Sequence, residues 1–102
     1  MRNFQFKFEW SPQKASSNLA KHGIAFPQAA AVFLDPLAAT ILDEEHVEGE
    51  QRWVTLGRSG TGRLLVVIHT YEESEAGFAA VRIISARPAT PSEVRDYEQG
   101  VP

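Results

Sequence analysis

The chain has 102 residues, a length that fits one domain and buries enough surface to fold without disulfide support. It has no cysteine, which excludes disulfides and thiolate metal sites and fits a reducing compartment, so we expect a cytoplasmic protein. The net charge of −3 argues against a strong non-specific nucleic-acid binder, yet five of the seven arginines lie between Arg52 and Arg87, so the net charge can hide a basic face.

The first element is predicted to be a strand, because Phe4, Phe6 and Phe8 alternate with polar residues and Trp10 extends the pattern. This segment lacks the apolar centre of about 7 to 15 residues that a signal peptide needs. No stretch approaches the ~18 apolar residues of a membrane span, so we expect a soluble protein without a membrane partner.

A helix is predicted over residues 12–22, because Ser11 is a good N-cap, Pro12 suits the first helical position and Gly23 follows the last turn. The spacing of side chains predicts an inward face and a second face. We expect the inward face to hold Ala15, Leu19 and His22, and the second face to hold Lys14, Asn18 and Lys21.

A second, shorter helix is predicted to begin at Phe26 and Pro27 and to stop at Asp35 and Pro36, with an apolar stripe along it. Residues 37–42 are predicted to form a strand. The acidic stretch over residues 43–50 has no periodicity, so we expect a loop there.

Two strands over residues 52–58 and 63–71 are predicted to form a hairpin through the turn at residues 59–62. A third strand, residues 78–86, completes an antiparallel meander. Thr90 and Glu93 match a capping box, which predicts a last helix to Gln99 that Gly100 ends. The order of elements predicts an α+β sandwich with the helices on one side of a mostly antiparallel sheet.

Two pairs of residues are open to a structural or a functional interpretation. Lys21 and His22 end a helix, where cations favour the macrodipole; alternatively, Lys21 binds a phosphate or His22 transfers a proton. Glu50 and Arg52 have a spacing of two at a strand entrance. They form either a proton-transfer and phosphate-binding pair or an exposed salt bridge.

The strand residues Arg63 and His69 are six positions apart, so both side chains are predicted to share a face with the apolar residues between them. A histidine on such a face is more often part of the core than catalytic, although His69 lies where the apolar run ends. Arg82 and Arg87 point to opposite faces if their strand stays regular.

No cofactor or metal site is expected. The acidic stretch has no ordered ligand spacing, so a solvated loop is the favoured interpretation over a metal site; its acidic residues and histidine are Asp43, Glu44, Glu45, His46, Glu48 and Glu50. There is no phosphate-binding glycine loop, since Gly57, Gly60 and Gly62 are interpreted as punctuation of the hairpin.

Six blocks, taken in order, resemble the BrnT toxin family. They are FEWSPQK (8–14), NLAKHGIAF (18–26), AVFLDP (31–36), EQRWVTLG (50–57), GRLLVVIHT (62–70) and RIISAR (82–87). The resemblance implies a fold like that of RelE-type ribonucleases, RNA cleavage that arrests growth, and neutralisation by a BrnA-like ribbon-helix-helix antitoxin. It also implies that operator DNA is bound only through the antitoxin, and we expect a complex with two copies of each chain.

Carried over by motif position, nine residues are expected around an RNA groove: Lys21, His22, Glu50, Arg52, Arg63, His69, Arg82, Ser85 and Arg87. Because the RNA 2′-hydroxyl is itself the nucleophile, RNA cleavage without a metal needs only proton transfer and cations. We expect Arg63 and Arg82 to stabilise the transition state, and His69 or Glu50 to transfer protons. Lys21 and Arg52 would bind the backbone.

Two departures from the family pattern concern the N-cap and the groove. Ser11 stands where the family has aspartate, an exchange of one capping residue for another, and Pro88 stands where a basic residue is common. The second removes a positive charge beside the expected groove. Two other functions stay open: a module without catalysis that only binds its antitoxin, and a divalent-metal protein built on the acidic loop.

Overall fold

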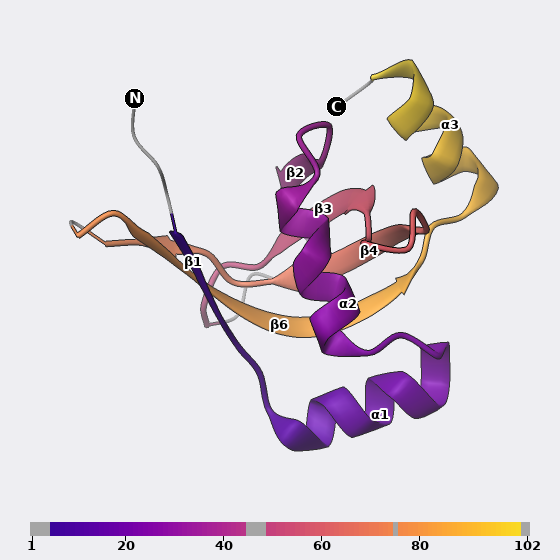
Figure 1. Cartoon of the computed structure of the whole chain (residues 1–102). Coiled ribbons are helices and arrows are strands. Elements are labelled where there is room, and N and C mark those ends of the chain that lie inside the picture. Colours follow the sequence, from indigo (N-terminus) through magenta and orange to yellow (C-terminus); the bar gives the residue numbers. More distant parts are fainter. Residues whose placement is uncertain (1–4, 45–48, 75, 101–102) are drawn as a thin grey trace.

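The computed structural model describes residues 5–44, 49–74 and 76–100 (Figure 1). The helical elements are α1 (Pro12–His22), α2 (Phe26–Ala30), a 3₁₀ turn η1 (Ala31–Leu34) and α3 (Pro91–Gln99). The strands are β1 (Gln5–Glu9), β2 (Ala39–Leu42), β3 (Trp53–Arg58), β4 (Leu64–His69), β5 (Glu72–Glu73) and β6 (Phe78–Pro88). Phe4 lies outside the described residues, and β1 ends at Glu9 without including Trp10.

The strands form one six-stranded sheet in the order β1-β6-β4-β3-β2, and β5 also pairs with β6. The predicted meander is confirmed, because β3, β4 and β6 pair antiparallel in succession. β1 pairs with β6 in parallel, which makes the sheet mixed. The α+β class is therefore confirmed, with the first strand at one edge of the sheet, beside the last strand.

Local signals define the ends of α1 and α3. The Ser11 hydroxyl accepts a hydrogen bond from the Lys14 amide at 3.3 Å, and Gly23 adopts a left-handed conformation with φ of 71°. Thr90 and Glu93 form the predicted capping box at the start of α3. Both helices begin and end as the sequence predicts, because these signals act within a few residues.

The core lies between the sheet and the first two helices; in Figure 1, α2 packs in front of the sheet and α1 lies below β6. It is built from apolar residues of α2, η1 and the central strands. Its fully buried members are Ile24, Phe26, Ala29, Val32, Leu65, Val67, Val81, Ile83 and Ala86. Side chains of β1, including Phe6 and Phe8, pack against this cluster.

The expectation that every helix lies on one side of the sheet is wrong for α3. Glu93 and Asp96 of α3 line a hollow with residues that alternate with the core positions: Ala39, Ile41, Val54, Leu56 and Val66. These residues lie on the second face of the sheet. The physical reason is that β4 is apolar on both faces, with four consecutive buried residues, so neither face can be left to water.

The predicted inward face of α1 is confirmed for Ala15, which packs against the core, but is wrong for Leu19. Leu19 is 53% exposed, whereas Asn18 is buried. The Asn18 amide nitrogen donates to the carbonyl oxygens of Ala86 at 2.8 Å and Ile24 at 3.0 Å, and its oxygen accepts from the Ala86 amide at 3.0 Å. β1 pairs with β6 only up to Arg82, so Asn18 satisfies backbone groups that no strand reaches.

Candidate nucleic-acid interface

Three of the predicted site residues, Lys21, His22 and Ser85, line one polar hollow of about 290 Å³ between α1 and β6. The other lining residues are Gln13, Lys14, Ser17, Asn18 and Ile84. The hollow exists because Asn18 fastens α1 to the edge of β6, which brings the last turn of the helix beside Ser85. Two lysines and a histidine around a polar hollow suit an anionic ligand.

Glu50 and Arg82 form an ion pair at one end of the sheet, and their side chains are 53% and 40% exposed. Arg82 lies between the buried residues Val81 and Ile83, so its side chain projects from the face away from the core. Its backbone is fixed to Thr70, which donates its amide to the Arg82 carbonyl at 3.0 Å and accepts the Arg82 amide on its hydroxyl at 3.2 Å. Glu50 was expected to pair with Arg52, but its partner is Arg82.

Arg63 lies at the opposite end of the sheet from Arg82. It is exposed and directly precedes β4, where its carbonyl accepts a hydrogen bond from the Ser59 amide of the hairpin turn. Arg82 lies beside Thr70, seven residues further along the same segment. At about 3.3 Å per residue, this separation is on the order of 20 Å, so the two arginines cannot contact one phosphate together.

Arg87 fastens α3 to the sheet. Its guanidinium donates to both carboxylate oxygens of Glu93, at 2.8 and 2.9 Å, and to the Pro88 carbonyl. These hydrogen bonds lower the pKa of Glu93 to about 2 and raise the pKa of Arg87. The two terminal nitrogens with which Arg87 could bind a phosphate thus already bind Glu93.

Arg82 and Arg87 project from the same face of the sheet. In a regular strand, a separation of five residues would place the two side chains on opposite faces. The pairing of β4 with β6 shifts by one residue between Ile68 and His69, which leaves Ile84 as an extra residue in β6. This bulge reverses the alternation after Ile83, so Ala86 returns to the core and Arg87 turns away from it.

His69 is fully buried, and both of its ring nitrogens have partners. Nδ1 lies 2.8 Å from the carbonyl oxygen of Thr70, Nε2 lies 2.7 Å from the hydroxyl of Thr55, and the ring packs edge-on against Phe33 at 4.8 Å between centroids. Burial lowers the pKa of His69, and the hydrogen bond to Thr70 opposes this only in part. The ring is therefore a neutral part of the core near pH 7.

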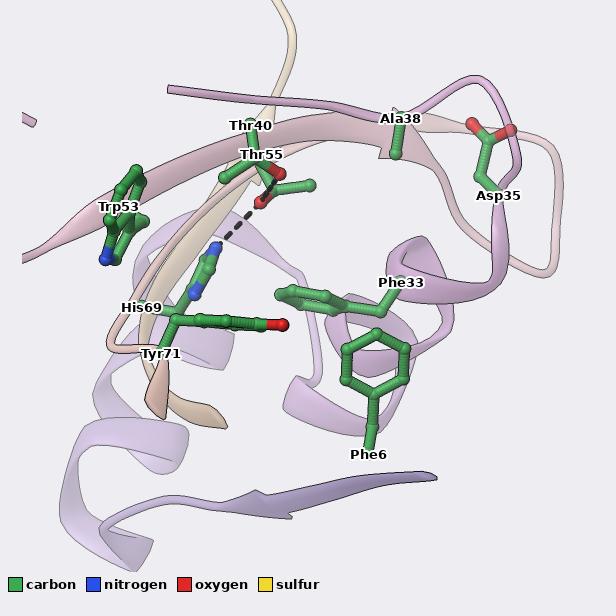
Figure 2. Close-up of a pocket in the computed structure, with 9 residues that line it drawn as sticks. All are labelled: Phe6, Phe33, Asp35, Ala38, Thr40, Trp53, Thr55, His69 and Tyr71. Atoms are coloured by element: carbon green, nitrogen blue, oxygen red, sulfur yellow. Dashed lines mark hydrogen bonds between the residues drawn. The ribbon is translucent and has the colours of Figure 1, made fainter. Parts of the chain in front are cut away.

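The sequence interpretation missed a pocket of about 490 Å³ around His69 (Figure 2). Its aromatic lining residues are Phe6, Phe33, Trp53 and Tyr71, and the others are Asp35, Ala38, Thr40, Thr55 and His69. The sequence did contain a signal for part of this pocket. A hairpin with its turn at residues 59–62 places Trp53 opposite His69, and the observed register has this pair. The contributions of β1 and β2 depend on how the sheet curls.

Asp35 anchors the loop at the rim of this pocket. Its carboxylate accepts hydrogen bonds from the Tyr97 hydroxyl at 2.6 Å, the Arg58 amide at 2.8 Å and the Leu37 amide at 2.9 Å. Burial alone would raise the pKa of Asp35, but these three donors outweigh it, and the pKa is lowered. Asp35 therefore joins the η1–β2 loop to β3 and α3.

Within residues 5–44, 49–74 and 76–100, no group of three histidine, cysteine, aspartate or glutamate side chains could hold a metal ion. Glu45, His46 and Glu48 of the acidic stretch lie outside these described residues. In the same described part of the chain, no helix is long and apolar enough to cross a membrane.

Comparisons with known proteins relate the chain to one family. A family model described as "Ribonuclease toxin, BrnT, of type II toxin-antitoxin system" matches residues 10–93. Among solved structures, the crystal structure of the Brucella abortus ribonuclease toxin BrnT is similar with a TM-score of 0.57 and 23% sequence identity. That match covers 84% of this chain and 99% of the Brucella chain. A search of curated protein sequences finds no significant match.

Proposed function

The chain belongs to the BrnT family of ribonuclease toxins of type II toxin–antitoxin systems, and from this membership we propose that it is an endoribonuclease that cleaves RNA without a metal ion. The observation that carries the proposal is the exposed ion pair between Glu50 and Arg82, because Arg82 lies on the same strand, β6, as Ser85 of the polar hollow. An acid–cation pair and a second set of cations that suits the RNA backbone thus both adjoin β6.

In the proposed reaction the RNA 2′-hydroxyl attacks the adjacent phosphate. Glu50 accepts the proton of the hydroxyl, and Arg82 stabilises the negative charge that develops on the phosphorane. The bond between phosphorus and the 5′-oxygen then breaks, and the leaving 5′-oxygen takes up a proton from water to become a 5′-hydroxyl. Between the two residues predicted to transfer protons, we favour Glu50, because it is exposed whereas His69 is buried. Arg52 lies two residues after Glu50, and we assign it to the flanking backbone.

The polar hollow would hold a more distant phosphate, with Lys21, His22 and Ser85 as its contacts. Arg63, at the far end of β4, would contact the RNA away from the scissile bond. Arg87 would hold α3 in place and would not contact the phosphate, because both terminal nitrogens of its guanidinium donate to Glu93.

Family membership implies an antitoxin partner, and we infer that it is a BrnA-like ribbon-helix-helix protein that binds operator DNA for the complex. Ribbon-helix-helix proteins are dimers, so a symmetric complex would contain two copies of each chain. The free toxin would act in the cytoplasm, where translated RNA is found.

Inducible expression with and without the adjacent small gene tests this function. We expect expression of the chain alone to arrest growth and to generate new RNA 5′ ends, and co-expression of the neighbour to abolish both effects. Arg82→Ala should remove toxicity, whereas Arg95→Ala, which changes an exposed arginine of α3, should not. Normal growth with soluble wild-type protein would instead favour a module that only binds its antitoxin.

A further inference from the structure

The pocket around His69 has no role in the chemistry assigned to Glu50 and Arg82. We propose that it binds one nucleobase of the RNA and so gives the enzyme a base preference at a fixed position near the cut. This inference rests on the proposed RNA cleavage and adds a specificity site to it. Its volume of about 490 Å³ falls within the ~300 to 1,000 Å³ of small-ligand pockets.

Four of the nine residues that line the pocket are aromatic. The rings of Phe6 and Phe33 are 5.6 Å apart between centroids. Figure 2 shows the Phe33 and Tyr71 rings with their edges toward the viewer, and Trp53 on the opposite side of His69 from Phe33. Tyr71 is 37% exposed, so the pocket is open to a ligand from solvent. Bases stack on such rings whatever their sequence, because every base has a π-face.

The hydrogen bonds inside the pocket have a defined direction. A carbonyl oxygen only accepts, so His69 Nδ1 carries the proton that points to Thr70, and the neutral ring leaves Nε2 as an acceptor. The Thr55 hydroxyl must then donate to Nε2 at 2.7 Å. Its oxygen accepts from the Thr40 hydroxyl at 2.8 Å, as the dashed lines in Figure 2 trace.

This direction leaves the Thr40 oxygen with free acceptor capacity and no spare proton. The Tyr71 hydroxyl already donates to Glu73, and the Asp35 carboxylate already accepts three hydrogen bonds. The pocket therefore suits a planar aromatic ligand that donates an N–H group to Thr40, which is the chemistry of a nucleobase edge. A purely apolar protein side chain would leave this acceptor unmatched.

The surroundings of the pocket suit a nucleotide rather than an isolated ring. Arg52 directly precedes Trp53, and Thr70, which precedes Tyr71, is hydrogen-bonded to the backbone of Arg82. Two of the aromatic walls thus lie next to the segments that carry the proposed phosphate contacts. The Arg82 side chain projects from the other face of the sheet, so a base in the pocket would belong to a nucleotide that flanks the one at Arg82.

Binding without cleavage tests the pocket directly. Trp53 fluorescence is titrated with short 2′-O-methyl oligonucleotides, which cannot be cleaved, in a Trp10→Phe background that removes the other tryptophan. We expect quenching by oligonucleotides and weakening of about tenfold or more in Tyr71→Ala, because one stacking surface is lost. Thr40→Val should weaken binding and Thr40→Ser should restore it, whereas Leu37→Ala, outside the pocket, should have no effect.

The mapped cut sites provide the second test. Wild-type protein should show a preferred base at one position relative to the cut, and Thr40→Val and Tyr71→Ala should flatten that preference while cleavage continues. An unchanged preference in both variants, with unchanged oligonucleotide binding, overturns the inference. So does a loss of antitoxin binding alone, which would assign the pocket to a protein partner. If wild-type protein cleaves no RNA, the proposed function fails, and the fluorescence titration still decides the pocket.

Discussion

At the scale of single residues, the buried amide of Asn18 has the clearest energetic role. It makes three hydrogen bonds with Ile24 and Ala86. Asn18→Ala would leave these buried backbone groups unpaired, so we expect the free energy of unfolding to fall by ~2 to 4 kcal/mol in urea titrations. Ser17→Ala, on the neighbouring exposed position, should change it little. Equal effects of the two substitutions would contradict this role for Asn18.

Gly57 is a second residue whose role lies in packing. Its sequence context suggested that it belongs to the hairpin turn, but it lies within β3. A Cβ atom there would lie 2.8 Å from Val32 Cγ1 and 3.0 Å from the Ala38 Cβ atom. We expect Gly57→Ala to lower the thermal midpoint through a loss of ~1 to 3 kcal/mol. Gly60→Ala is the control, because its nearest neighbour would be 4.0 Å away; a similar loss there would contradict the packing argument.

At the scale of elements, α3 is attached to the rest of the fold mainly through polar contacts. None of its residues is buried. Glu93 binds Arg87, and Tyr97 donates to Asp35 while its ring lies 5.3 Å from the Arg58 guanidinium. A helix of nine residues is too short to be stable alone, so these contacts decide whether it forms.

The attachment of α3 is expected to depend on acid. Glu93 has its pKa lowered from 4.5 to about 2, so its stabilising effect is present above pH ~4.5 and is lost as the pH falls through about 2. Because the pair is partly exposed, we expect this contribution to be about 1 kcal/mol. The protection of the α3 amides from hydrogen exchange, relative to the intrinsic exchange rate at each pH, should fall over that range. Glu93→Gln should show fast exchange already at neutral pH, whereas Glu98→Gln should behave as wild type.

At the scale of the whole molecule, the proposed mechanism predicts the products and the metal dependence of cleavage. Cleavage should continue in excess EDTA and leave a 2′,3′-cyclic phosphate and a 5′-hydroxyl, because the attacking group belongs to the RNA. Arg82→Ala should lower the rate by ~10²-fold or more, by analogy with lost oxyanion donors. Arg63→Ala should have a smaller effect on the rate, since Arg63 lies on the order of 20 Å from Arg82. Activity that EDTA abolishes and a divalent ion restores would contradict this mechanism and favour a metal site in the acidic stretch.

The assembly with the antitoxin is a second property of the whole molecule. A dimeric partner offers two equivalent sites, so light scattering of the co-purified complex should give the mass of two copies of each chain. The mass of a one-to-one complex that does not change with concentration would argue against a dimeric partner.

The sequence by itself determined what depends on neighbouring residues. The bounds of α1 and α3 follow from Ser11, Gly23 and the Thr90–Glu93 box, and the pairing of β3 with β4 follows from a short turn. Hydrogen bonds and dihedral preferences within a few residues decide these features, so they can be predicted before the fold is known. The six family blocks likewise predicted the α+β fold and the family.

Only the tertiary structure decided which residues meet. Asn18 is buried because β6 has an open edge at Ala86, and Glu50 pairs with Arg82 because a strand 32 positions later passes beside it. The bulge at Ile84 places Arg82 and Arg87 on one face, and the curl of the sheet brings Phe6 and Thr40 into one pocket. These contacts join distant segments, so their geometry depends on how both faces of the sheet are covered and not on any local signal.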